Sequence, residues 1–228
     1  MEDYMKVIAR IHSDFPTKFG IPRQSGLAQT EAVIIFEPEY RCDEAVRGIE
    51  QYSHLWLIWE FSEVKDKPWS PTVRPPRLGG NRRIGVFATR SPFRPNPIGL
   101  SCVKLLKVEK TSEGTVLVVE GADLMDNTPI YDIKPYIPYA DCKTDAAGGF
   151  AEEKKDYAIG VECSGELLNR IPENKRKAFI QILSQDPRPS YIDDNKRVYG
   201  FGYAGFEIKF IVEDCVLKVT DIQYSRQE

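Results

Sequence analysis

The stretch HLWLIWEF, residues 54–61, is the strongest strand signal in the sequence. It is aromatic and aliphatic almost throughout, which is typical of a strand buried on both faces. Other strand-like runs lie on either side of it and end at turn-forming residues: KVIARIHS (6–13), AVIIFEP (32–38), IGVFATR (84–90), GLSCVKLLKVEK (99–110), TVLVVEGADLM (115–125) and IYDIKPYIP (130–138). Because these runs do not alternate with helices, the sequence disfavours a doubly wound parallel sheet. It predicts a mainly β fold built on a closed or nearly closed β-barrel.

Short helices are expected beside these strands. In CDEAVRGIEQY (42–52), Asp43 is placed to cap a helix whose apolar side carries Val46 and Ile49. Residues 1–140 are therefore predicted to form the β-barrel domain with short helices.

The pattern changes after residue 140. Residues 141–156 are polar, small and glycine-containing, as in a linker or an excursion. Helical spacing follows in SGELLNRIPENKRKAFIQILSQDP (164–187), and the chain closes with hairpin-like strands around Glu213-Asp214. We predict a small α+β C-terminal domain over 157–228.

Composition excludes several protein classes. The 228 residues are 42% hydrophobic and 29% charged, and 31 basic against 34 acidic residues give a net charge of −3. These values do not fit a disordered, collagen-like or membrane-spanning chain. Five widely spaced cysteines without a CxxC, and two distant histidines, argue against a zinc site or a disulfide framework. The start, MEDYMKVIAR, lacks the pattern of a signal peptide, so we expect reduced thiols and a cytoplasmic protein.

The charge is unevenly distributed. No Asp or Glu occurs between Lys67 and Val108, although this stretch carries nine basic residues: Lys67, Arg74, Arg77, Arg82, Arg83, Arg90, Arg94, Lys104 and Lys107. A solvated basic face is one interpretation. The missing acids and the abundance of arginine favour a surface for anions or nucleic acid.

The segment RPPRLGGNRRIGVFATRSPFRPNPIGLS (74–101) places arginines on rigid turns. Its prolines fix the backbone, so Arg90 and Arg94 are held in set directions and can grip a carboxylate or phosphate. An internal pair of Arg90 with Asp123 or Asp126 is the structural alternative. The sequence contains no GxGxxG after a strand, no P-loop and no GxSxG.

Five blocks of the sequence resemble one family. They are PRQSG (22–26), YSHLW (52–56), the segment 74–101, DLMDNTPIYDIKPY (123–136) and DPRPSY (186–191), and together they extend over most of the chain. They are similar to the TrmO proteins, also called the TsaA-like family. The resemblance implies a homodimeric, S-adenosylmethionine-dependent tRNA methyltransferase on a β-barrel rather than a Rossmann fold. It implies methylation of N6 of threonylcarbamoyladenosine, immediately 3′ to the anticodon, with the cofactor near the subunit interface.

The resemblance also implies site residues. Those expected to bind the cofactor are Pro22, Arg23, Gln24, Ser53, His54, Arg90, Leu100, Asp123, Leu124, Met125 and Asp126. Those expected to serve tRNA through the DPRPxY motif are Asp186, Arg188 and Tyr191. No metal is implied. The base that accepts the N6 proton stays open among His54, Asp126 and the substrate's own carboxylate. On its own, His54 is more typical of an edge histidine than of a catalyst.

Position within the basic segment suggests a division of labour. Arg82, Arg83 and Arg94 are expected to face solvent and contact tRNA phosphates, whereas Arg90 is expected to hold the cofactor. Two other functions compete with this one. The chain could be a non-catalytic barrel that binds nucleic acid or a small ligand, or a methyltransferase of the same cofactor type with a substrate other than tRNA.

Overall fold

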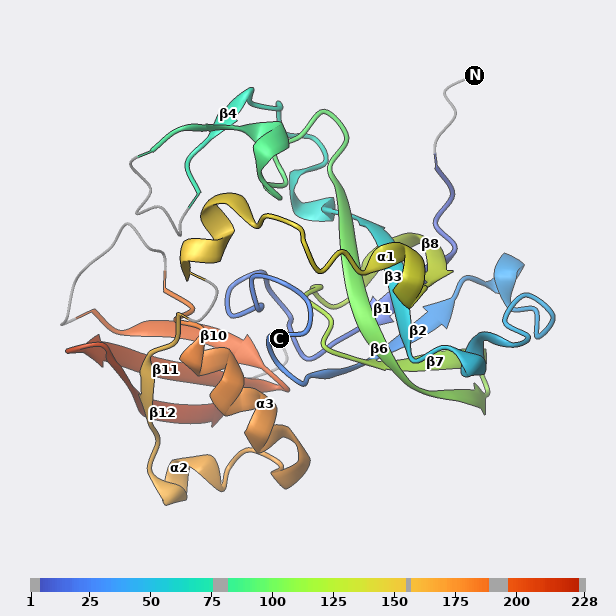
Figure 1. Ribbon diagram of the computed structural model, residues 1–228. Coiled ribbons are helices and arrows are strands. Elements are labelled where there is room, and N and C mark those ends of the chain that lie inside the picture. The colour runs from blue at the N-terminus through green and yellow to red at the C-terminus, as the bar shows by residue number, and fades with distance from the viewer. Residues whose placement is uncertain (1–4, 76–81, 155–156, 189–196, 226–228) are drawn as a thin grey trace.

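The computed structural model describes residues 5–75, 82–154, 157–188 and 197–225. Six antiparallel strands form a closed ring in the order β1-β2-β7-β6-β3-β8 (Figure 1). Their bounds are β1 (Ala9–His12), β2 (Glu31–Phe36), β3 (His54–Glu60), β6 (Ile98–Thr111), β7 (Gly114–Glu120) and β8 (Thr128–Pro135). The predicted mainly β fold with few, short helices is confirmed.

Strand β3 is buried on one face only. Leu55, Leu57 and Trp59 point into the core of the ring, while Trp56 and Ile58 are partly exposed. The prediction that this strand is buried on both faces is therefore wrong. An antiparallel ring has a single interior, so even an almost wholly apolar strand turns every second side chain outward.

The expected strand over 84–90 is also wrong beyond its second residue. Ile84–Gly85 forms β5, which pairs with β4 (Thr72–Val73), and Val86–Ala88 then turns into a 3₁₀ helix. Side chains bind the carbonyls that a strand would offer to a neighbour: the Thr89 hydroxyl donates to Val86 O at 2.8 Å, and Arg94 donates to the same oxygen at 3.2 Å. The β4–β5 hairpin lies away from the C-terminal sheet (Figure 1).

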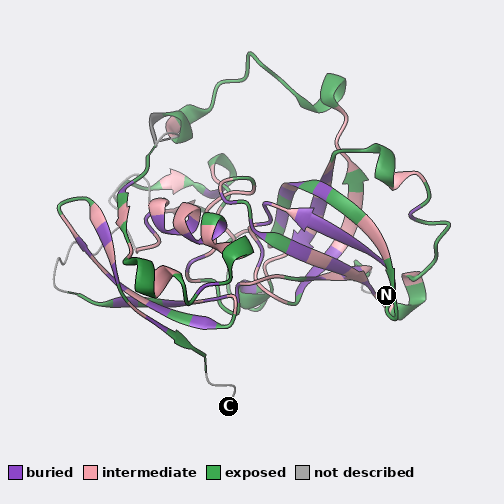
Figure 2. Cartoon of the chain, turned by 90° about the horizontal axis from the view of Figure 1, so that it is seen from below, coloured by how far each residue is buried: buried purple, intermediate pink, exposed green. Residues whose placement is uncertain are grey.

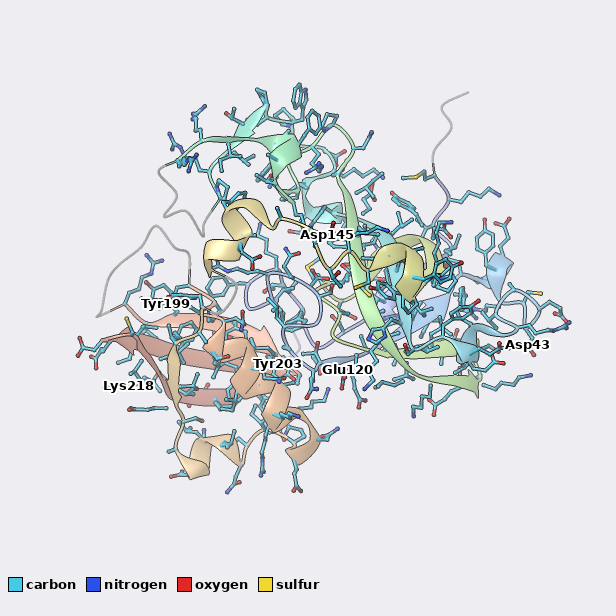
Figure 3. The ribbon with its side chains drawn as sticks, viewed as in Figure 1. Asp43, Glu120, Asp145, Tyr199, Tyr203 and Lys218 are labelled. Carbon is cyan, nitrogen blue, oxygen red and sulfur yellow. The ribbon has the colours of Figure 1, made fainter. Side chains whose placement is uncertain are left out.

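Asp43 does not cap a helix. Its loop forms turns and a 3₁₀ helix at Ile49–Gln51, and its carboxylate accepts hydrogen bonds from Lys110 Nζ and Thr115 Oγ1, each at 2.5 Å. The hydrogen bond from Lys110 is the main cause that lowers the pKa of Asp43. Asp43 therefore ties this loop to the β6–β7 hairpin, on the side of the ring away from the C-terminal sheet (Figure 3).

The connection after β8 is mostly exposed and arches across to the C-terminal region (Figure 2). It holds the short helix α1 (Pro138–Asp141) and a 3₁₀ helix at Gly149–Lys154. The predicted helical stretch contains α2 (Gly165–Leu168) and α3 (Glu173–Ser184), separated near Pro172. The sheet order is β10-β11-β12-β9, with bounds β9 (Gly160–Glu162), β10 (Tyr199–Tyr203), β11 (Phe206–Glu213) and β12 (Val216–Tyr224).

Two hydrophobic cores result, one inside the ring and one between α3 and the C-terminal sheet. The segment between β1 and β2 joins the second core. Phe15 is fully buried there, 5.7 Å from the ring of Tyr203, and Asp14 forms an ion pair with Lys175 of α3. The domain limits given above remain a prediction, but this N-terminal segment packs with the C-terminal elements. Within the described ranges, no helix is long and apolar enough to cross a membrane.

Candidate functional site

A cavity of about 520 Å³ opens where β3 ends and β6 begins. Its walls come from the loop 18–24, the end of β3 with residues 59–64, the turn 89–94, the start of β6 and the turn 123–128. Gly99 and Trp59 both form part of the wall. The Trp59 ring packs so closely against Gly99 that a Cβ at this position would collide with the ring. The volume falls within the range of about 300–1,000 Å³ that is typical of ligand sites.

Seven of the predicted cofactor residues line this cavity, although they are far apart in the sequence. They are Pro22, Arg23, Gln24, Arg90, Leu100, Asp123 and Met125. Leu124 does not line it, because its side chain is fully buried in the core of the ring. The ring thus brings together three sequence blocks that resemblance alone had linked.

Asp123 is held by a chain of hydrogen bonds inside the cavity wall. Trp59 Nε1 donates to Ser101 Oγ at 2.9 Å, and that hydroxyl donates to Asp123 Oδ1 at 2.5 Å. Burial raises the pKa of Asp123, while the bond from Ser101 and the charge of Arg90 oppose the shift. The sequence analysis missed Ser101 and the role of Trp59; their only signal was a hydroxyl and an indole within otherwise apolar strands.

The main contact of Arg90 is not the ion pair with Asp123 or Asp126 that was the structural alternative. Its guanidinium donates to the side-chain oxygen of Gln24, and it acts on Asp123 through its charge. Two predicted cofactor residues that are far apart in the sequence therefore contact each other in the cavity wall. A ligand carboxylate entering here would meet an exposed guanidinium whose present partner is a neutral amide.

Glu60 is a second carboxylate of the cavity wall that the sequence analysis missed. Its side chain is only 12% exposed and lies 3.4 Å from Lys65 Nζ. Burial and a hydrogen bond to Glu60 raise the pKa of Tyr131 to about 12. An acid that ends an aromatic strand was the available signal. The cavity is thus lined by three carboxylates, those of Glu60, Glu63 and Asp123, and by three arginines between apolar walls, a pattern suited to a ligand with charges of both signs.

Ser53, His54 and Asp126 lie outside the cavity. Ser53 and His54 share a hydrogen bond of 2.9 Å at the start of β3, whereas the cavity lies at its other end. Asp126 accepts a hydrogen bond from the amide of Ser13 at 3.1 Å and lies 3.4 Å from His12 Nδ1. Within a single chain, the two candidate bases, His54 and Asp126, therefore do not line the cavity with the seven predicted cofactor residues that do.

Arg23 connects the cavity to the DPRPxY motif. It donates to the backbone oxygens of Asp186 and Arg188, both at 3.4 Å. Asp186 in turn forms a two-pronged ion pair with the Arg188 guanidinium, at 2.8 and 3.0 Å, and accepts from the Tyr157 hydroxyl at 3.0 Å. We call Tyr157, Asp186 and Arg188 the Asp186 cluster. Tyr191 lies outside the described residues.

The predicted tRNA arginines differ in exposure. Arg82 and Arg83 are exposed, and Arg83 donates to Thr72 Oγ1 at 3.3 Å. Arg94 is half-buried, lines the cavity and donates to Thr89 O at 2.7 Å, so the expectation that it faces solvent is wrong. The proline turn directs the Arg94 side chain back toward the backbone of its own turn.

In the part of the chain that the structure describes, no group of three or more His, Cys, Asp or Glu could hold a metal ion.

Comparison with known proteins identifies the family of the chain. Residues 10–142 match the family model of the tRNA-methyltransferase O N-terminal domain, and residues 158–225 match that of the TrmO C-terminal domain. A tRNA (adenine(37)-N6)-methyltransferase from Escherichia coli is 38% identical over 93% of this chain and 94% of its own.

A named protein and a crystal structure, both from Pseudomonas aeruginosa, are also similar to this chain. One, named for S-adenosylmethionine-dependent methyl transfer, is 44% identical over 81% of each chain. The other is a crystal structure of TrmO, 33% identical, which superposes with a TM-score of 0.76 over 97% of this chain and 99% of its own. With matches of this extent in sequence and in fold, the chain belongs to the tRNA-methyltransferase O family of enzymes.

Proposed function

We propose that this enzyme transfers the methyl group of S-adenosylmethionine to N6 of threonylcarbamoyladenosine, next to the anticodon of threonine tRNA. The observation that carries the proposal is the cavity, where seven predicted cofactor residues meet. The six-stranded ring would serve as the β-barrel methyltransferase domain. A tRNA substrate implies that the enzyme works in the cytoplasm.

The cavity chemistry fits the proposed cofactor. S-adenosylmethionine carries a carboxylate, an ammonium, a sulfonium and an adenine ring. Arg90 can bind the carboxylate, Glu60 or Asp123 can bind the ammonium or a ribose hydroxyl, and apolar walls can hold the adenine. The cofactor supplies the activated methyl group. The chain's own contribution is to align it with N6, and such alignment can be worth about 7–11 kcal/mol.

The positions of Ser53 and His54 support a homodimer. His54 starts β3, directly after Ser53, and lies six positions from Glu60, which corresponds to about 20 Å at 3.3 Å per residue. The outward face of the neighbouring strand β6 exposes Ile98, Leu100 and Leu106 by 36–53%. In the proposed dimer this face is covered, and Ser53 and His54 of the partner subunit approach the cavity. The cofactor would then lie at the subunit interface.

Mass spectrometry of tRNA nucleosides tests the reaction. Protein and isotope-labelled cofactor are incubated with tRNA that carries threonylcarbamoyladenosine and with tRNA that has plain adenosine at the same position. We expect label only in the modified base. Label in neither tRNA, with cofactor binding intact, would instead favour another substrate. Absence of cofactor binding in titration calorimetry, with or without a chelator, would favour the non-catalytic barrel.

Mixing two inactive variants tests the shared site. Arg90→Ala and His54→Ala damage opposite halves of it, so random mixing makes half of the dimers hybrid, each with one intact site. Activity should return to about a quarter of the wild-type value if sites are shared. If the mixture recovers no activity and light scattering gives a monomeric mass, the proposed dimer is excluded.

A further inference from the structure

The β4–β5 hairpin presents exposed aromatic rings for which the proposed reaction gives no role. We call residues 69–75 and 82–94 the aromatic flap. Trp69 is 49% exposed, Phe87 72% and Phe93 41%. Single exposed rings are common on proteins, but three on one short element beside a cavity are an unusual concentration of apolar surface.

The backbone of the flap is held together by hydrogen bonds. Ser70 N donates to Phe93 O at 3.3 Å, and Val86 N donates to Pro71 O at 3.0 Å, so the two arms of the hairpin and the following turn form one unit. The Arg94 guanidinium lies 5.6 Å from the centre of the Phe87 ring. The backbone that carries the rings is therefore held in place, and Phe87, the most exposed of the three, remains largely open to solvent beside Arg94.

The charged side chains of the flap itself have a single sign. The flap lies within the stretch from Lys67 to Val108, which has no Asp or Glu, and its Arg74, Arg82 and Arg83 are exposed. Aromatic rings interleaved with cations are the combination that binds single-stranded nucleic acid: the cations follow the phosphates, and the rings stack on the bases. An apolar protein partner would gain nothing from these exposed cations.

The flap continues directly into the cavity wall. Thr89, Arg90, Pro92 and Arg94 line the cavity, and Phe87 and Phe93 lie within two residues of them in the chain. A nucleotide whose base reaches the cofactor at this cavity would have its neighbours in the RNA strand close to the flap. We propose that the aromatic flap binds the unstacked nucleobases beside the target adenosine, with Phe87 as the main stacking surface. This inference rests on the proposed tRNA substrate.

Substitutions at Phe87 test the stacking role. The affinity for an anticodon stem-loop RNA bearing the modified adenosine, and the affinity for S-adenosylmethionine, are measured for each variant. Phe87→Ala and Phe87→Leu should weaken RNA binding by about 5- to 150-fold, which corresponds to the roughly 1–3 kcal/mol of one base stacked on an aromatic ring. Phe87→Tyr, which keeps the ring, should stay within about twofold of the wild type. Cofactor affinity should not change.

Salt dependence and a matched control separate stacking from charge. The slope of log affinity against log salt should be unchanged in Phe87→Ala and flatter in Arg82→Ala, since only the arginine releases counterions. Tyr139 is 88% exposed but lies outside the flap, so Tyr139→Ala should bind RNA normally. Equal losses in Tyr139→Ala and Phe87→Ala would overturn the proposal, because the flap would then be no different from any exposed ring.

Two further outcomes would also refute it. If Phe87→Ala becomes monomeric in light scattering while the wild type is dimeric, the flap is a subunit interface. If the wild type binds and methylates the RNA and Phe87→Ala does so equally well, only the flap proposal fails. If the wild type neither binds nor methylates it, the failure lies in the proposed function itself.

Discussion

Replacing Asp186 tests whether the Asp186 cluster supports the cavity. The Asp186 and Arg188 side chains are only 11% and 15% exposed, and their ion pair is two-pronged. Removing one partner from a buried pair costs about 3–5 kcal/mol, because the other charge stays buried alone. The slight exposure of this pair favours the lower end. We therefore expect Asp186→Asn to lower the free energy of unfolding by about 3 kcal/mol.

Asparagine is the suitable replacement. Asp186 has a φ of 51°, in the left-handed region that Asn tolerates better than most residues, so the backbone conformation can persist. The variant then changes the charge without imposing a new turn. Urea unfolding measures the stability. In a cycle with Arg188→Gln, the double variant should be less destabilised than the sum of the singles by about 1–3 kcal/mol, since it leaves no orphan charge.

The same variant should affect the cofactor. Arg23 is anchored on the carbonyls of Asp186 and Arg188 and also lines the cavity. If the cluster loosens, Arg23 loses this anchor, and we expect S-adenosylmethionine to bind about fivefold more weakly, equivalent to about 1 kcal/mol. Glu39→Gln, which breaks an exposed ion pair with Lys6, is the control, and it should leave both the free energy of unfolding and the cofactor affinity essentially unchanged.

At acid pH, the difference in the free energy of unfolding between the wild type and Asp186→Asn should become smaller. Burial alone would raise the pKa of Asp186, but the hydrogen bonds and charge of Arg188 and the Tyr157 hydroxyl outweigh it and lower the pKa below 3.8. Because the pKa of Asp186 is lower in the folded state, the stabilisation is fully present at pH values above the pKa of the unfolded state. It is lost as the pH falls through the pKa of the folded state.

A loss of less than about 1 kcal/mol in the free energy of unfolding of Asp186→Asn at pH 7, with unchanged cofactor affinity, would refute the reasoning.

Three other substitutions probe the cavity wall and the second core. Ser101→Ala leaves Trp59 Nε1 and Asp123 without their shared partner, and urea unfolding should show a loss of about 1–3 kcal/mol together with weaker cofactor binding in calorimetry. Gly99→Ala sets a Cβ against the Trp59 ring and should cost about 1–3 kcal/mol in the same assay. Tyr203→Phe removes a buried hydroxyl that has no hydrogen-bond partner among the described residues. Its melting temperature should stay equal or rise by about 2–4 °C, and a marked fall would mean that the hydroxyl is bonded.

The strands were predictable because their patterns are local. The runs that became β2, β6, β7 and β8 are β-branched or alternate, and each ends at Gly, Pro or Asp-rich turns. Segment 84–90 failed for a non-local reason: Arg94, several residues later, folds back and binds the carbonyl of Val86. Strand propensity cannot predict that a side chain from the following turn will bind the carbonyl oxygen that a neighbouring strand would otherwise use.

The candidate site was predictable only through the resemblance. Nothing in the pattern around Gln24, Arg90 or Asp123 indicates that the three share one cavity. Their meeting follows from the closure of the ring, which sets the start of β6 beside the end of β3. Glu60 and Ser101 escaped notice for the same reason, since each is a single polar residue in a strand and gains meaning only from what faces it.

The dependence of the cavity on the C-terminal elements is the least local feature of all. The chain leaves the ring after β1, buries Phe15 beside Tyr203, and then returns through the loop that carries Arg23 and Gln24. One end of this excursion is fixed by the ion pair of Asp14 with Lys175, and its middle by the contacts of Arg23 with the Asp186 cluster. The loop proposed to bind the cofactor is thus shaped from both sides by residues more than 140 positions later. A motif such as DPRPxY can therefore matter for methylation through the geometry of the cofactor site, even where its own charged groups are already paired within the protein.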